Sequence, residues 1–169
     1  HLARTCRARI ILTRRSAFPP KASWPELLRS PDLPPATRRI LEAITEMERL
    51  GGEVDVCVAE ASDRQQMQRI IGDTLARYGS LHGVFHAAGA VTPSLLANVT
   101  TGMAERVLAP KVQGTRILFD LLRGIEPDFL VLFSSMSSVT GPYAHGDYSA
   151  ANWYLDAFAA YANAQSRMR

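Results

Sequence analysis

Long apolar runs are absent from this sequence of 169 residues. No segment reaches the roughly 20 apolar residues that a membrane-spanning helix needs, and His1-Leu2-Ala3-Arg4 lacks the apolar stretch of a secretory signal. The two cysteines, Cys6 and Cys57, do not have the spacing of metal ligands. These absences predict no metal site, no membrane partner and two buried free thiols in a cytoplasmic protein.

Aromatic residues are also sparse, at 8%, and the net charge is only +3. Five arginines near the N-terminus raise nucleic acid as a possible partner: Arg4, Arg7, Arg9, Arg14 and Arg15. No aromatic residues are interleaved with them and no nucleic-acid-binding motif accompanies them, so they favour a local anion site instead. The apolar content of 47% is enough for the core of one domain.

Strand and helix patterns alternate along the chain. Short apolar runs predict strands at 9–13, 54–58, 81–87 and 129–133, and helical periodicity predicts helices at 35–50, 62–78, 101–123 and from Tyr148 onward. The strands are apolar along their whole length, which is typical of parallel strands covered on both faces. We therefore expect an α/β fold with a parallel sheet and helices on both faces.

Several local features refine this expectation. The predicted buried face of the helix at 35–50 consists of Ile40, Ile44, Met47 and Leu50. Ser62 is expected to cap the next helix, and residues 1–8 predict the last turns of another. Residues 16–38 contain six prolines and predict a loop insert with one short helix, anchored by Trp24.

A serine, a tyrosine, an asparagine and a lysine stand at informative intervals. Ser135 precedes Tyr148 by thirteen residues, Asn152 follows Tyr148 by four, and Lys111 precedes Ser135 by twenty-four. A tyrosine, a serine and a lysine brought together can protonate a carbonyl oxygen while a hydride arrives from a cofactor. Alone, Lys111 would be an ordinary solvated helix residue and Tyr148 a packing residue. Their combination favours the catalytic interpretation.

Other candidate residues follow the ends of the predicted strands, where open parallel sheets bind ligands. Arg14 and Arg15 follow the first strand, Glu60 the second, Ala87-Ala88-Gly89 the third and Ser134-Ser135 the fourth. A planar guanidinium suits a phosphate, with solvated surface arginines as the alternative. The small residues at 87–89 would let a cofactor ribose approach the backbone, with a plain turn as the alternative.

Four segments, taken together, resemble the ketoreductase domains of modular polyketide synthases, a branch of the short-chain dehydrogenase/reductase family. They are His86-Ala87-Ala88-Gly89, Leu108-Ala109-Pro110-Lys111-Val112-Gln113-Gly114, Phe133-Ser134-Ser135 and Tyr148-Ser149-Ala150-Ala151-Asn152. Most short-chain dehydrogenases have a lysine four residues after the tyrosine, where this chain has Asn152. The exchange of lysine and asparagine is similar to that in polyketide and animal fatty acid synthase ketoreductases. It argues against a nucleotide-sugar epimerase.

The resemblance implies a Rossmann-like fold and NADPH-dependent reduction of a β-ketoacyl thioester on an acyl carrier protein, with other synthase domains as partners. Tyr148 would be the general acid, and the cation of Lys111 would favour its phenolate. Ser135 would donate a hydrogen bond to the carbonyl and stabilise the developing alkoxide. Asn152 would position a water or the lysine in a proton relay.

The resemblance also implies cofactor contacts. Arg14, helped by Arg15, would hold the adenosine 2′-phosphate of NADPH. Glu60 stands where the family usually has an aspartate against the adenine ring, and this substitution weakens its assignment. Ala87, Ala88 and Gly89 would form the floor under the ribose.

The glycine-rich turn that opens dinucleotide-binding folds is absent from the sequence. In the family this turn lies upstream of the helix whose end is predicted at 1–8, and further strands follow the helix that carries Asn152. We therefore expect residues 1–169 to be the central part of one ketoreductase domain, truncated at both ends and inactive alone. The alternative is a catalytically silent structural domain of a synthase, against which the joint retention of the four catalytic candidates argues.

Overall fold

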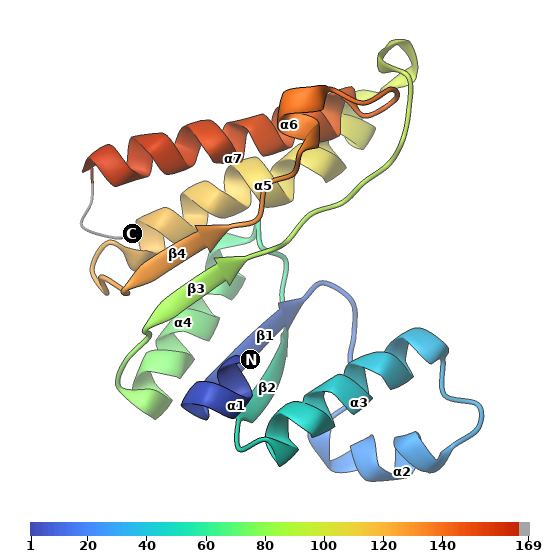
Figure 1. The fold of residues 1–169 in the computed structure, drawn as a ribbon, viewed down its shortest axis with the longest axis vertical. Helices are drawn as coiled ribbons and strands as arrows, with labels where there is room; N and C mark the ends of the chain where they lie inside the picture. The colour runs from blue at the N-terminus through green and yellow to red at the C-terminus, as the bar shows by residue number, and fades with distance from the viewer. Residues whose placement is uncertain (166–169) are drawn as a thin grey trace. The chain divides into compact units, whose positions relative to one another are not determined.

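The computed structural model describes residues 1–165, in two compact units, His1–Ala59 and the residues from Glu60 onward (Figure 1). The first unit contains α1 (Leu2–Cys6), β1 (Arg9–Arg14), η1 (Lys21–Ser23), α2 (Trp24–Arg29), α3 (Pro35–Arg49) and β2 (Glu53–Val58). The second contains α4 (Arg64–Tyr78), β3 (Gly83–His86), η2 (Leu96–Asn98), α5 (Thr101–Leu122), β4 (Phe129–Leu132), α6 (Ser137–Thr140) and α7 (Gly146–Gln165). Residues 166–169, the end of the predicted domain, lie outside the described residues. No helix in the described part is long and apolar enough to cross a membrane.

The strands pair in parallel within each unit. β1 pairs with β2 from Arg9 opposite Glu53 to Arg14 opposite Val58, and β3 pairs with β4 from Gly83 opposite Phe129 to His86 opposite Leu132. Parallel neighbours need a crossover connection. The chain supplies it with α3 between β1 and β2 and with α5 between β3 and β4. The predicted α/β class with parallel strands is confirmed.

The proline-rich insert contributes to the core of the first unit. Trp24 is buried, its Nε1 donates to the main-chain oxygen of Pro19 at 2.8 Å, and Phe18 packs edge-on against its ring. The buried cluster around it consists of Trp24, Leu33, Leu41, Ile44 and Val54. The anchoring role predicted for Trp24 and the predicted short helix, α2, are confirmed.

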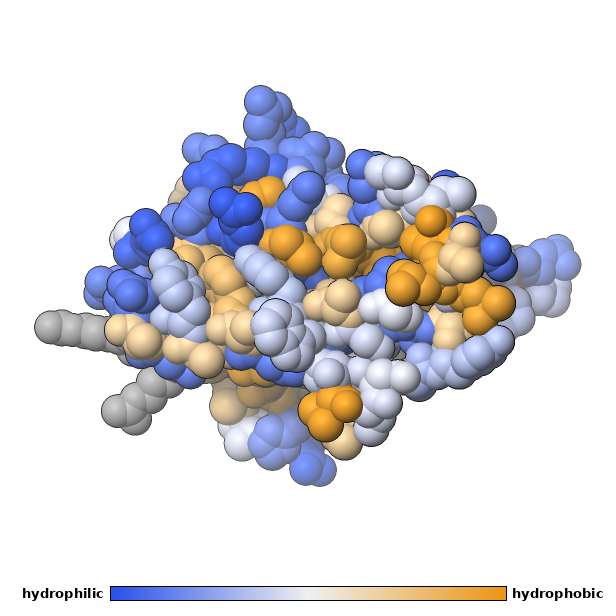
Figure 2. Space-filling model, turned by 90° about the horizontal axis from the view of Figure 1, so that it is seen from above, coloured by the Kyte–Doolittle hydropathy of each residue, from blue (hydrophilic) through white to orange (hydrophobic). Residues whose placement is uncertain are grey.

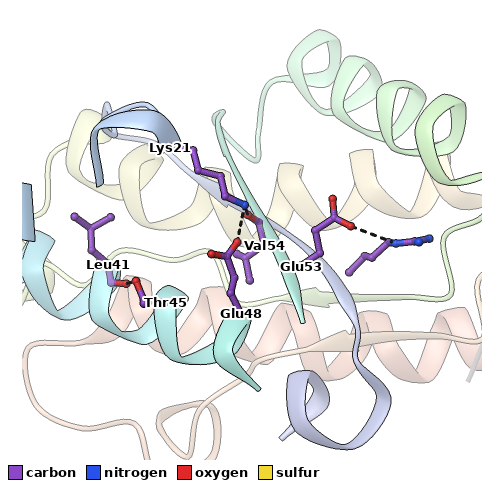
Figure 3. Close-up of polar contacts among 7 residues, drawn as sticks. Lys21, Leu41, Thr45, Glu48, Glu53 and Val54 are labelled. Carbon is purple, nitrogen blue, oxygen red and sulfur yellow. Dashed lines mark hydrogen bonds and ion pairs between the residues drawn. The ribbon is translucent and has the colours of Figure 1, made fainter. Parts of the chain in front are cut away.

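Lys21 ties this insert to the rest of the first unit. Its Nζ lies 2.5 Å from Oε1 of Glu48 on α3 and donates to the main-chain oxygen of Val54 on β2 at 3.2 Å (Figure 3). The side chains of Lys21 and Glu48 are both partly exposed to solvent, and such ion pairs contribute at most about 1 kcal/mol. The apolar cluster around Trp24 therefore supplies more of the stability of this unit than the charges do.

The buried face of α3 differs from the predicted one. Leu41 is fully buried and Ile44 almost so, whereas Ile40 is 37% exposed. Positions three and four residues before Ile44 both lie near its face, so periodicity alone could not separate Leu41 from Ile40. Packing against the Trp24 cluster selects Leu41.

Two smaller predictions are wrong. The N-cap of α4 is Asp63 rather than Ser62, because the carboxylate of Asp63 accepts from the main-chain nitrogen of Gln66 at 3.0 Å. A carboxylate at this end also interacts favourably with the helix dipole. The two cysteines were expected to be buried, but Cys6 is exposed and Cys57 is half-buried. The short α1 buries only Ala3.

The assignment of the α3 face predicts a difference between two neighbouring substitutions. Leu41→Ala should lower the free energy of unfolding by about 2–5 kcal/mol, since it leaves a cavity in a closed core. Ile40→Ala, the matched control, should cost less than about 1.5 kcal/mol because its side chain already contacts water. Urea unfolding, monitored by the hydrogen exchange of peptides from residues 35–58, measures both changes in the free energy of unfolding. Equal costs would contradict the assignment.

Candidate active site

Lys111 occupies the middle of α5 and is buried, with 4% of its surface exposed. Its Nζ donates to the main-chain oxygen of Phe133, just after β4, at 2.8 Å and lies 6.0 Å from the ring centre of Tyr148 on α7. Burial lowers the pKa of Lys111 below its usual 10.5, and the charge of Asp156 opposes part of this shift. Three elements of the second unit thus meet at one ammonium group.

Tyr148 lies in the first turn of α7 and is half-buried. Its main-chain nitrogen donates to Oδ1 of the buried Asp147 at 2.8 Å, and the ring of His145 packs edge-on against its ring. The turn before α7 is held by Ser94, whose main-chain nitrogen donates to the oxygen of Ala144 at 2.8 Å. These contacts fix the start of the helix and so the position of the phenol.

Ser135 is held just beyond β4 by the first turn of α6. Its Oγ accepts from the main-chain nitrogen of Ser137 at 3.2 Å, and its main-chain oxygen accepts from Oγ of Ser138 at 2.9 Å. A hydroxyl that accepts one hydrogen bond keeps its own hydrogen for donation. Ser134 instead donates from Oγ to the main-chain oxygen of Asn152 at 3.2 Å. Sequence reasoning did not predict α6, whose four residues are too few for a periodic pattern.

Asn152 is fully buried one helical turn after Tyr148. Its Nδ2 donates to the main-chain oxygen of Tyr148 at 2.7 Å, while its Oδ1 is buried without a hydrogen-bond partner. Leaving such an acceptor unpaired costs about 1–3 kcal/mol. An N–H or O–H donor is therefore expected at this atom when the site is occupied.

Gly89 lies against the lysine. A Cβ at this position would be 3.1 Å from Cε and 3.6 Å from Nζ of Lys111. The absence of a side chain at Gly89 thus leaves room for the buried side chain of Lys111. The sequence around Gly89 did not reveal this reason for a glycine at the position. Ala87 and Ala88 connect β3 to Gly89, and the contact predicted between these three residues and a cofactor remains a prediction.

Glu60 opens the second unit and is half-buried. Its main-chain nitrogen donates to Oε1 of Gln66 on α4 at 2.9 Å. A Cβ at Gly114 would be 3.3 Å from the main-chain oxygen of Ala61. The missing side chain therefore lets α5 approach the residue that follows Glu60. The role predicted for Glu60 at the adenine ring remains a prediction.

Arg14 and Arg15 belong to the first unit, at and just after the end of β1. Nη2 of Arg14 donates to Oγ of Ser16 at 2.9 Å, and the guanidinium lies over the ring of Phe18. Its Nη1 is buried without a hydrogen-bond partner. A half-buried guanidinium with an unpaired N–H suits an anion, so Arg14 fits the predicted phosphate contact better than the exposed Arg15.

His86 is a residue of the site that sequence reasoning missed. It ends β3, is buried, and its Nε2 lies 3.0 Å from the main-chain oxygen of Pro110, so Nε2 carries the hydrogen. Burial lowers the pKa of His86 below its usual 6.5; the bond to Pro110 opposes this, and the charge of Lys111 adds to it. The sequence contained one indication of this residue, namely a histidine at the end of an apolar strand and next to Ala87-Ala88-Gly89.

Apolar side chains are exposed on segments that lead to α7 or pack on it. They are Leu96, Met136, Val139 and Tyr143. Leu96 approaches the start of α7, since its Cδ1 would be 3.5 Å from a Cβ at Gly146. On the face drawn in Figure 2, hydrophobic residues gather in patches between hydrophilic ones. Exposed apolar patches of this kind commonly mark a surface that contacts a ligand or another protein part.

The parallel strands and their crossover helices define an α/β protein of Rossmann-like fold, and solved ketoreductases share it. The family described as the KR domain matches residues 1–168. The chain therefore belongs to the KR domain family.

Similar proteins are polyketide synthases. The chain is 35% identical over 155 residues to 6-methylsalicylic acid synthase of Aspergillus terreus, covering 89% of this chain and 8% of that protein. It is 34% identical over 136 residues to mycoketide-CoA synthase of Mycobacterium tuberculosis, covering 80% and 3%. A crystal structure of a ketoreductase domain from the bacillaene assembly line matches with a TM-score of 0.81 and 30% identity, covering 97% of this chain and 35% of that one. The chain thus spans a small part of these synthases.

The lowered pKa of His86 predicts a loss of stability in acid. Above pH 6.5 the ring is neutral in both states; as the pH falls from 6.5 to the lowered pKa of the folded protein, only the unfolded chain gains a proton. The glutamine in His86→Gln does not titrate. The difference in free energy of unfolding between the wild type and this variant should therefore shrink as the pH falls through this range. Urea unfolding of both proteins between pH 8 and 5 measures it. A constant difference would contradict the shift.

Proposed function

We propose that the intact domain containing this chain reduces a β-ketoacyl thioester on an acyl carrier protein to the β-hydroxyacyl thioester, with NADPH as reductant. The observation that carries the proposal is the buried Lys111, whose Nζ lies 6.0 Å from the ring centre of Tyr148. Membership of the KR domain family and the similarity to polyketide synthases support it. The other synthase domains would supply the carrier-bound substrate.

The residues of the chain fit a nicotinamide cofactor. Arg14 offers a buried, unpaired N–H to a phosphate, and only small residues, Ala87 to Gly89, follow β3. Bound NADPH supplies the hydride, which no amino-acid side chain can provide. Arg14 would distinguish NADPH from NADH through the additional phosphate.

Tyr148 and Ser135 act on the carbonyl oxygen of the substrate. The phenol of Tyr148 donates its proton to that oxygen as negative charge develops on it. The hydroxyl of Ser135, which already accepts from the nitrogen of Ser137, donates a hydrogen bond to the same oxygen. Because α6 and α7 fix both groups before substrate arrives, little reorganisation is needed during the reaction.

Lys111 would return a proton to the phenolate of Tyr148 and regain one from water, while Asn152 positions that water or the lysine. Burial lowers the pKa of Lys111, which makes its ammonium a readier proton donor to the phenolate left on Tyr148. Oδ1 of Asn152 accepts from a water or from the lysine, which satisfies its unpaired acceptor. The exposed apolar residues near the start of α7 would contact the acyl chain.

Removal of the phenol tests the general acid. Tyr148→Phe should lower kcat by about 10²-fold or more, the usual range for a general acid, with the fold unchanged. Tyr161→Phe, which removes the hydroxyl of an exposed tyrosine further along α7, is the matched control and should leave the rate unchanged. NADPH oxidation with a β-ketoacyl thioester measures both.

Two outcomes would contradict the proposal. Full activity of Tyr148→Phe would remove the tyrosine from the mechanism. A wild-type domain that oxidises no NADPH with any β-ketoacyl thioester would instead support the catalytically silent structural domain.

Arg14→Ala tests the phosphate contact. A hydrogen bond to a charged group contributes about 1.5–3 kcal/mol, so the Kd for NADPH should rise by about ten- to a hundredfold while that for NADH changes little. Arg4→Ala, an exposed arginine on α1, serves as control. Cofactor fluorescence titration gives the constants, and equal losses for both cofactors would refute the contact.

A further inference from the structure

Three hydrogen bonds link β3, the end of β4 and α5 in a closed circuit. Nε2 of His86 donates to the oxygen of Pro110 at 3.0 Å, and Nζ of Lys111 donates to the oxygen of Phe133 at 2.8 Å. The main-chain nitrogen of Phe133 donates to the oxygen of His86 at 3.1 Å. The peptide bond between Pro110 and Lys111 closes the circuit. The imidazole is therefore one of the connections that hold the lysine.

The hydrogen bond from His86 is important because its acceptor belongs to a proline inside a helix. A proline inside a helix removes one N–H donor, and its ring crowds the carbonyl four residues earlier, so the local helical turn is less well determined. Pro110 is buried within α5 and immediately precedes Lys111. The helix is continuous through Pro110 but has one hydrogen bond fewer at this turn, so a donor from β3 on the Pro110 carbonyl adds a restraint there.

The lysine has little freedom to compensate for a displaced turn. Its Cε would be only 3.1 Å from a Cβ at Gly89, and its Nζ is bonded to Phe133. A shift of the Pro110 turn would therefore move Nζ away from the Phe133 oxygen or from the ring of Tyr148. The groups that face the ammonium are Tyr148, Asp156 and His86 itself.

We propose that His86 is a positioning residue for Lys111: its hydrogen bond to the Pro110 carbonyl holds the turn of α5 that carries the lysine. Nζ is thereby kept between the Phe133 oxygen and the Tyr148 ring. The effect on reaction rate rests on the function proposed above, whereas the placement of the lysine does not.

Amine labelling of the full-length protein tests the placement without any substrate. Acetic anhydride labels lysines according to their accessibility, and peptide mass spectrometry separates Lys111 from Lys21, the only other lysine of this sequence and an exposed internal standard. His86→Leu removes the donor, and His86→Asn is too short to reach Pro110. His86→Gln retains an N–H at similar reach. Val84→Ala, two residues earlier on the same face of β3, loosens packing without removing a side-chain donor.

We expect His86→Leu and His86→Asn to raise the labelling rate of Lys111 relative to Lys21 by about tenfold, the equivalent of one hydrogen bond. His86→Gln and Val84→Ala should remain near the wild type. In the reductase assay kcat should fall by a similar factor in the first two variants, with KM for the cofactor unchanged, and recover in His86→Gln.

Unchanged labelling of Lys111 in His86→Leu and His86→Asn would overturn the proposal. An equal rise in Val84→Ala would overturn it too, because general loosening would then explain the effect. If labelling changes as expected but the wild type reduces no β-ketoacyl thioester, the positioning role stands and the proposed function fails.

Discussion

The second unit is organised around the hydrogen bond from the buried Lys111 ammonium to the main-chain oxygen of Phe133. Taking a cation out of water is costly, and the cost falls only if its hydrogens find acceptors. Burial lowers the pKa of Lys111, so its proton is held less firmly than on a solvated lysine even though the carbonyl of Phe133 accepts one of its hydrogens. The same bond fixes α5 to the end of β4, which links the chemistry of the group to the fold.

The start of α7 supplies the other half of the site. Helical spacing puts Asn152 one turn after Tyr148, and the side chain of Asn152 reaches back to the oxygen of Tyr148. Ser134, two residues after β4, donates from Oγ to the main-chain oxygen of Asn152. The phenol is therefore positioned from the strand side and along its own helix, while its hydroxyl remains available to a substrate. Lys111 is buried and Tyr148 partly exposed, so in the proposed mechanism the group that meets the ligand would be separate from the buried group that returns its proton.

The sequence was sufficient to predict features that depend on local pattern. Continuous apolar runs located the four strands, and the spacing of Ser135, Tyr148 and Lys111 indicated residues that the structure brings to adjoining elements. It was insufficient where two neighbouring positions satisfy the same pattern, as for Leu41 against Ile40 and for Asp63 against Ser62. It also missed His86, because its partner is a main-chain oxygen twenty-four residues away and main-chain groups leave no trace in sequence. The roles of Arg14, Arg15 and Glu60 depend on a ligand and stay predictions.

The contact between Gly89 and Lys111 makes two distant positions share one small volume. A methyl group at residue 89 would displace the methylene next to the ammonium, and a branched side chain at residue 111 would press on the backbone after β3. A change at either position therefore affects the space available to the other. Among related chains, a larger residue at position 89 should therefore tend to occur together with a change at position 111.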